Sequence, residues 1–185
     1  LDASAHMAER DGAGTRFDLA RAAAGAVLGA LEAGGAHRAA LVTAGDGARL
    51  RTPLGPPADA ARALAALDPE AARSAATPID AALQLAASVA SGARPSAAAA
   101  IVVVSDGRAW PTELAAAEAA ARAAEAGGAV VLAIGVGDRT APVRPVLRAL
   151  VGDAARVLDT RTGREAGAWV VAGARCPPGP WWMGR

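Results

Sequence analysis

The sequence has no lysine and only one cysteine among its 185 residues. A single cysteine, Cys176, cannot form an internal disulfide or build a zinc cage of thiolates. An excess of charge of one sign is also lacking, because 19 basic residues stand against 18 acidic ones and the formal net charge is +1. A chain balanced in this way carries no electrostatic footprint for nucleic acid or for an anionic membrane surface.

Long apolar runs are missing as well. The longest, Ala97 to Val104, falls far short of the roughly 20 residues that a membrane-spanning helix needs. The hydrophobic content of 53% reflects alanine instead. A chain of this length fits one α/β domain with a sizeable core. We predict that domain over residues 1–173, followed by a Pro- and Trp-rich tail or linker over residues 174–185.

What is present is an alternation of helix-like and strand-like segments. Apolar spacing predicts helices near residues 17–31, 58–67, 78–89, 112–126, 142–150 and 164–171, and strands near 39–44, 49–54, 97–105, 129–136 and 155–158. Thr77 and Thr112 are the expected N-caps of two of these helices, with Pro78 at the first helical position. The order predicts a three-layer, Rossmann-like α/β fold with helices on both faces of a mostly parallel sheet. Gly45-Asp46-Gly47 signals a hairpin, which makes one strand antiparallel.

The beginning of the chain departs from this pattern. A chain of this fold class should open with a whole strand, whereas only Leu1 stands before the first loop. We therefore expect the first strand to be truncated, with several of its residues upstream in the native protein.

Oxygen-bearing side chains gather where predicted strands end. Asp2 and Ser4 follow the remnant of the first strand, Thr77 opens a helix, and Asp106 closes an apolar strand before Gly107. In open α/β sheets the carboxyl ends of the strands form the edge at which ligands bind. Carboxylate and hydroxyl oxygens converging there suit a hard divalent cation.

Four segments in order carry a family resemblance. LDASAHM at the start resembles the LDxSxSM opening of von Willebrand factor A (vWA) domains, and TPIDAAL is similar to their threonine segment. IVVVSDG resembles their strand that ends in DG, and VLAIGVG resembles the core strand that follows. Order and spacing agree from Leu1 to about Val171. The chain thus looks like a vWA domain of bacterial type.

The resemblance implies a metal-ion-dependent adhesion site (MIDAS). Ser4 and Thr77 would be direct hydroxyl ligands of Mg²⁺ or Mn²⁺, and Asp2 and Asp106 would hold metal-bound waters. Members of the family usually bind a protein partner, often through a partner's Glu or Asp as the last ligand. Bacterial members frequently work beside an ATPase of the AAA+ class.

His6 stands where the family pattern has a third small hydroxyl, so the site is degenerate. Three interpretations are open. The imidazole fills the metal position and inactivates the site, or it replaces the hydroxyl as a ligand and favours Mn²⁺, Zn²⁺ or Ni²⁺. Alternatively it points to solvent, and the remaining positions bind weakly.

Enzyme classes fit the sequence less well than an interaction module. A dinucleotide site could use Gly135 and Gly137, but the third glycine of that motif is missing. A phosphoryl-transfer enzyme could use Asp2 as nucleophile, but Ser4 takes the place of a second acid and no lysine is present. We therefore expect non-catalytic protein–protein interaction through Asp2, Ser4, His6, Thr77 and Asp106. The alternative is a structural or scaffold domain whose metal site is inactivated by His6.

Overall fold

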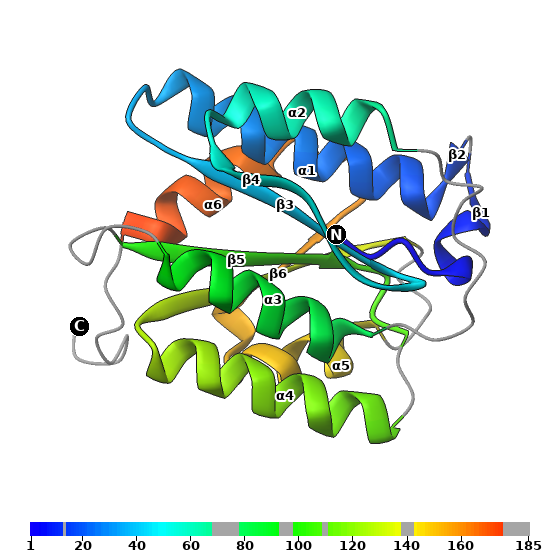
Figure 1. Cartoon of the computed structure of the whole chain (residues 1–185). Helices are drawn as coiled ribbons and strands as arrows, with labels where there is room; N and C mark the ends of the chain where they lie inside the picture. Colours follow the sequence, from blue (N-terminus) through cyan, green and yellow to red (C-terminus); the bar gives the residue numbers. More distant parts are fainter. Residues whose placement is uncertain (13, 68–77, 93–97, 109–110, 138–142, 176–185) are drawn as a thin grey trace, which may run out of the picture.

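The computed structural model describes residues 1–12, 14–67, 78–92, 98–108, 111–137 and 143–175. A central layer of strands lies between two layers of helices (Figure 1). The helices of one face are α1 (Arg16–Ala33), α2 (Pro57–Ala65) and α6 (Ala166–Arg175), and those of the other are α3 (Ile79–Ser91), α4 (Pro111–Ala126) and α5 (Val143–Val151). The predicted three-layer α/β fold is confirmed.

The strands of the central layer, β3 to β7, form two hydrogen-bonded groups. In one, β3 (Ala39–Gly45) pairs antiparallel with β4 (Gly47–Gly55), as the hairpin signal predicts. In the other, β5 (Ala99–Ser105), β6 (Ala129–Val136) and β7 (Val157–Thr160) are parallel neighbours. In this sheet layer β4 is therefore the antiparallel strand that the hairpin signal predicts. The pairings of β6 with β5 and with β7 are parallel, as predicted.

Leu1, Asp2 and Ala3 join the two groups. Asp2 forms a parallel bridge with Ala44 of β3, and its backbone N–H donates to the carbonyl of Val104 in β5 over 2.8 Å. The Ala44 N–H donates to the carbonyl of Leu1 over 3.0 Å. These three residues therefore occupy the place at which the sequence predicts the end of a first strand.

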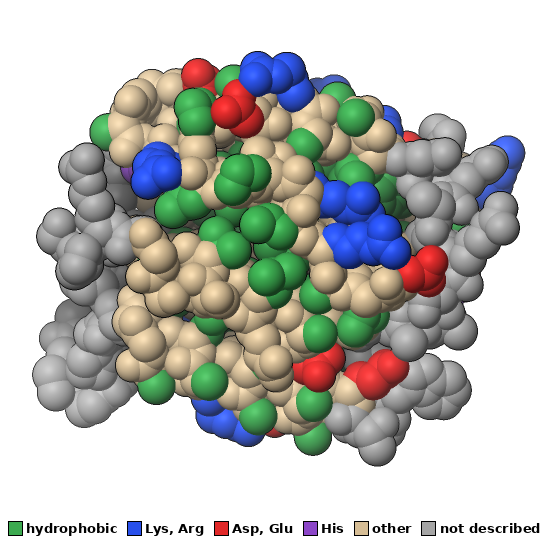
Figure 2. Space-filling view, in the orientation of Figure 1, with side chains coloured by type: hydrophobic (Ala, Val, Ile, Leu, Met, Phe, Trp, Pro, Cys, Tyr) green, Lys and Arg blue, Asp and Glu red, His purple; other side chains and the backbone are tan. Residues whose placement is uncertain are grey.

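A cavity of about 220 Å³ opens between β3 and β5 beyond Leu1. Its walls are mainly apolar side chains of β3, β5, α1 and α3, among them Leu41, Ile101 and Leu83. Hydrophobic side chains also gather in the middle of the face shown in Figure 2. The terminal amine of Leu1 lies beside the cavity and donates to the carbonyl of Val42 over 2.9 Å. Burial lowers the pKa of this amine to about 6, although the carboxylate of Asp2 acts in the opposite direction.

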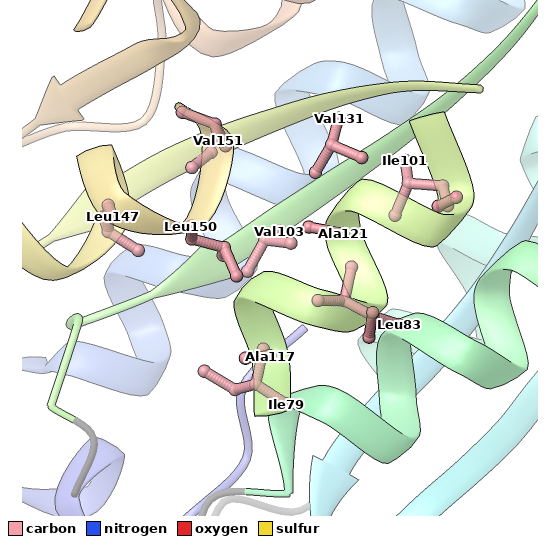
Figure 3. Packing of buried hydrophobic residues seen from close by; sticks show 13 residues of the cluster. Ile79, Leu83, Ile101, Val103, Ala117, Ala121, Val131, Leu147, Leu150 and Val151 are labelled. Carbon is pink, nitrogen blue, oxygen red and sulfur yellow. The ribbon is translucent and has the colours of Figure 1, made fainter. Parts of the chain in front are cut away.

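Apolar side chains fill both faces of the sheet. Figure 3 shows the cluster that α3, α4 and α5 form with β5 and β6, which includes Ile79, Leu83, Ile101, Val103, Val131, Leu147 and Leu150. The cluster on the opposite face includes Met7, Phe17, Val27, Leu132, Ile134 and Val170. Burial on both faces explains why the sequences of β5 and β6 are continuously apolar rather than alternating.

Helices α6 and α1 approach closely because glycine stands at the contact. A Cβ atom on Gly163, just before α6, would lie 2.5 Å from the backbone nitrogen of Ala23, and one on Gly167 would collide with the carbonyl oxygen of Ala26. Helix α6 ends at Arg175, two residues beyond the predicted domain boundary. None of the helices in the described ranges is long and apolar enough to cross a membrane.

Two predicted helix starts were wrong. Helix α3 begins at Ile79, so Pro78 is its N-cap rather than its first residue. Helix α4 begins at Pro111, which places Thr112 inside the first turn instead of at the cap. Both corrections concern one residue, and a proline is compatible with either position because it lacks the backbone N–H that a helix start leaves unpaired.

Candidate functional site

Asp2 lies buried at the edge of the sheet with both carboxylate oxygens engaged. Its Oδ1 accepts from the backbone N–H of Ser4 over 2.9 Å, and its Oδ2 accepts from the Ser105 hydroxyl over 2.6 Å. Loss of solvation raises the pKa of Asp2, although these two hydrogen bonds act in the opposite direction; nearby Asp106 adds to the rise. The hydrogen bonds therefore fix the position of the carboxylate, but they do not fully offset the cost of burying its charge.

Ser4 is buried and its hydroxyl oxygen has no hydrogen-bond partner among the described residues. It is the N-cap of a short 3₁₀ helix, η1 (Ala5–Ala8), yet its side chain makes no capping bond. An unpaired buried hydroxyl costs roughly 1–3 kcal/mol. Such an oxygen is available to a ligand.

Asp106 follows β5 and is also buried. Its Oδ1 accepts from the backbone N–H of Arg108 over 3.1 Å, and its Oδ2 accepts from Nη1 of Arg16 over 3.0 Å. The turn between them needs Gly107, whose φ of +70° favours glycine. The tight turn holds the Asp106 carboxylate beside the start of α1.

Arg16 and its partners were not predicted from the sequence. This arginine is the first residue of α1, and its guanidinium group contacts Asp106, Glu9 and, more distantly at 3.9 Å, Asp11. A positive side chain at a helix N-terminus opposes the helix dipole. That conflict is the sequence signal that could have indicated carboxylate partners for Arg16.

Glu9 carries the outer part of this ion-pair cluster. Its carboxylate accepts from Nη1 of Arg16 over 2.8 Å and from Nη1 of Arg108 over 2.7 Å. Partial desolvation raises the pKa of Glu9, but the two guanidinium groups outweigh it and hold the pKa below its ordinary value. Asp11 lies in the two-strand hairpin β1 (Arg10–Asp11) and β2 (Gly14–Thr15) that follows.

Of the two remaining predicted site residues, His6 and Thr77, the structure describes only His6. His6 is in η1, its side chain is 36% exposed, and its Nδ1 lies 3.7 Å from Oε1 of Glu9. Thr77 lies outside the described residues. The structure thus brings together Asp2, Ser4 and Asp106, while His6 is turned toward Glu9.

The oxygen donors at this edge decide whether a divalent cation fits there. Among the described residues, no group of three or more His, Cys, Asp and Glu side chains is placed to hold a metal ion. A site that uses hydroxyl ligands with carboxylates behind them does not need such a group. The unpaired hydroxyl of Ser4, beside the buried carboxylate of Asp2, fits a hard cation.

Comparison with known proteins identifies the family. A family model for the von Willebrand factor type A domain matches residues 1–108, which is more than half of the chain. The chain belongs to this family. The resemblance inferred from its four sequence segments is thereby confirmed. A comparison with curated proteins finds no match.

Solved vWA-like structures share the fold. BatB, a conserved hypothetical protein from Bacteroides thetaiotaomicron, is 18% identical with a TM-score of 0.75, over 95% of this chain and 97% of that one. Manganese-loaded TRAP of Plasmodium vivax is 14% identical with a TM-score of 0.72, over 92% and 69%. Proximal thread matrix protein 1 from the mussel byssus, with a zinc-occupied MIDAS motif, is 17% identical with a TM-score of 0.69, over 93% and 45%. Similarity at these identities establishes the fold alone.

Proposed function

We propose that this vWA domain is a non-catalytic module that binds a protein partner at the sheet edge carrying Asp2, Ser4 and Asp106. In this proposal Thr77 and His6 complete the edge, and Mg²⁺ or Mn²⁺ takes part in binding. A bound cation supplies an electron-poor centre that accepts an oxygen from a partner's Glu or Asp. An AAA+ ATPase is the partner class to test first.

One observation carries the proposal. Among the described residues, the buried hydroxyl of Ser4 has no hydrogen-bond partner, although each carboxylate oxygen of Asp2 beside it accepts one hydrogen bond. Buried polar atoms in proteins are nearly always satisfied, so an unsatisfied oxygen at this edge supports the proposal that a ligand such as a cation binds there. In this site Asp2 and Asp106 would remain behind the hydroxyl oxygens and orient water, while Ser4 contacts the cation.

A second candidate function rests on a different observation. Arg16 already places a positive charge 3.0 Å from Asp106, which reduces the negative charge that a cation would meet. If the charge of Arg16 prevents a cation from binding, the domain is a scaffold whose metal site is inactive. The sequence alternative, in which His6 inactivates the site, leads to the same function.

Calorimetric titration of the protein with MgCl₂, MnCl₂ and ZnCl₂ distinguishes the two functions. We expect binding of Mg²⁺ or Mn²⁺ that Ser4→Ala abolishes and that Ser91→Ala, a change at an exposed serine, leaves intact. His6→Ser then tests the histidine, because gained Mg²⁺ binding shows that His6 had blocked the site. Absence of metal binding in both the native protein and His6→Ser would support the scaffold.

A further inference from the structure

The carboxylate of Glu9 is held at both of its oxygens by different arginines. Nη1 of Arg16 donates to Oε2 over 2.8 Å, and Nη1 of Arg108 donates to Oε1 over 2.7 Å. His6 adds a third nitrogen 3.7 Å from Oε1. Two guanidinium groups on one carboxylate are a strong, charge-assisted arrangement for binding an acidic side chain.

The two arginines are positioned by contacts that do not involve Glu9. Arg16 is largely buried, bonded to Asp106, and backed by Gly137, where a Cβ atom would lie 3.3 Å from its Nε. Arg108 is anchored through its backbone N–H to Asp106, and its Nε lies 3.7 Å from Oδ2 of the same residue. Removal of Glu9 would therefore leave both Nη1 atoms in place without their bond to this carboxylate, while Nη1 of Arg16 would keep its bond to Asp106.

Glu9 is the replaceable member of the cluster. Its side chain is 45% exposed, whereas that of Asp106 is 2% exposed. Its backbone carbonyl accepts from the N–H of Arg16 over 3.1 Å, so the backbone stays in place while the exposed side chain is free to turn away from the arginines. Exposed ion pairs contribute little to stability, since water solvates both partners once they separate.

We propose that Arg16 and Arg108 form a carboxylate-binding site, which Glu9 occupies in the free protein and which an acidic side chain of a partner enters by displacing Glu9. The site recognises a Glu or Asp side chain without a metal ion. This inference rests on the proposed function in taking the edge as a partner surface, but it does not require a cation.

The test uses a fluorescein-labelled hexaglutamate peptide, with hexaglutamine as the neutral control, in fluorescence anisotropy at low salt with EDTA present. We expect Glu9→Gln to bind hexaglutamate about tenfold more tightly than the native protein, because the internal competitor loses its charge. Adding Arg108→Gln to Glu9→Gln should remove the gain. Arg122→Gln, which alters another exposed ion pair on α4, is the matched control and should keep it.

The outcomes separate this inference from the metal-dependent proposal. A gain in Glu9→Gln that persists in EDTA and depends on Arg108 supports the carboxylate site, even if no metal binds. Unchanged affinity in Glu9→Gln, or a gain that survives Arg108→Gln, overturns it. Binding that appears only when Mg²⁺ or Mn²⁺ replaces EDTA, with no effect of Glu9→Gln, overturns this inference and leaves the metal site standing. Glu9→Ala, which removes the carboxylate altogether, must reproduce the gain.

Discussion

The guanidinium group of Arg16 donates to Oδ2 of Asp106 over 3.0 Å, although the two residues are 90 positions apart in the chain. The contact connects the start of α1 to the end of β5 at the edge where the candidate site lies. Since Asp106 is buried, its charge depends on Arg16 and on the backbone N–H of Arg108. Charge and geometry at this edge are therefore set by the same interaction.

The first prediction concerns this pair. Asp106→Asn preserves the size of the side chain but removes the charge that Arg16 faces, and we expect the free energy of unfolding to fall by about 1–3 kcal/mol. Urea denaturation of both proteins measures the change. Asp46→Asn, at an exposed turn, is the control and should change the free energy by less than about 0.5 kcal/mol. Equal stability of the two variants would show that the buried pair contributes nothing.

The second prediction concerns Ser105, whose hydroxyl donates to Asp2 over 2.6 Å and accepts from the backbone N–H of Gly107 over 3.0 Å. Ser105→Ala leaves a buried carboxylate oxygen and a buried N–H unpaired, so we expect a loss of about 1–3 kcal/mol. The pKa of Asp2 should rise further, because the hydrogen bond from Ser105 lowers it. Denaturation and NMR titration measure the two effects. A loss no larger than that of Ser91→Ala, at an exposed site, would contradict the prediction.

The third prediction separates close packing from backbone strain. Gly163 and Gly152 have nearly the same positive φ, +72° and +70°, but only Gly163 packs against α1. Gly152→Ala should cost about 1–2 kcal/mol from conformation alone. Gly163→Ala should cost about 1–3 kcal/mol more, because its Cβ would meet the backbone at Ala23. Thermal and urea unfolding of both variants measure this difference in stability. Equal losses in the two variants would show that α6 can move away from α1 without cost.

The long elements could be predicted from the sequence because local periodicity determines them. Apolar spacing identified α1 and the apolar runs identified β5 and β6. The hairpin of β1 and β2 was missed, because strands of two residues have no periodicity to detect.

The site was predictable only where a residue belongs to a strand end. Asp2, Ser4 and Asp106 follow strands, so their meeting at one edge follows from the topology of parallel sheets. Arg16 and Glu9 could not be placed in this way. Their contacts depend on how the opening loop folds back over β5, which no local pattern encodes.

The close approach of α6 to α1 bears on which sequences can adopt this fold. A Cβ atom on Gly163 or Gly167 would meet the backbone of α1, so packing alone disfavours any larger residue at either position. Glycine at these two positions is therefore a requirement of helix packing. Its presence in a related sequence would indicate the same spacing between α1 and α6 rather than a shared ligand.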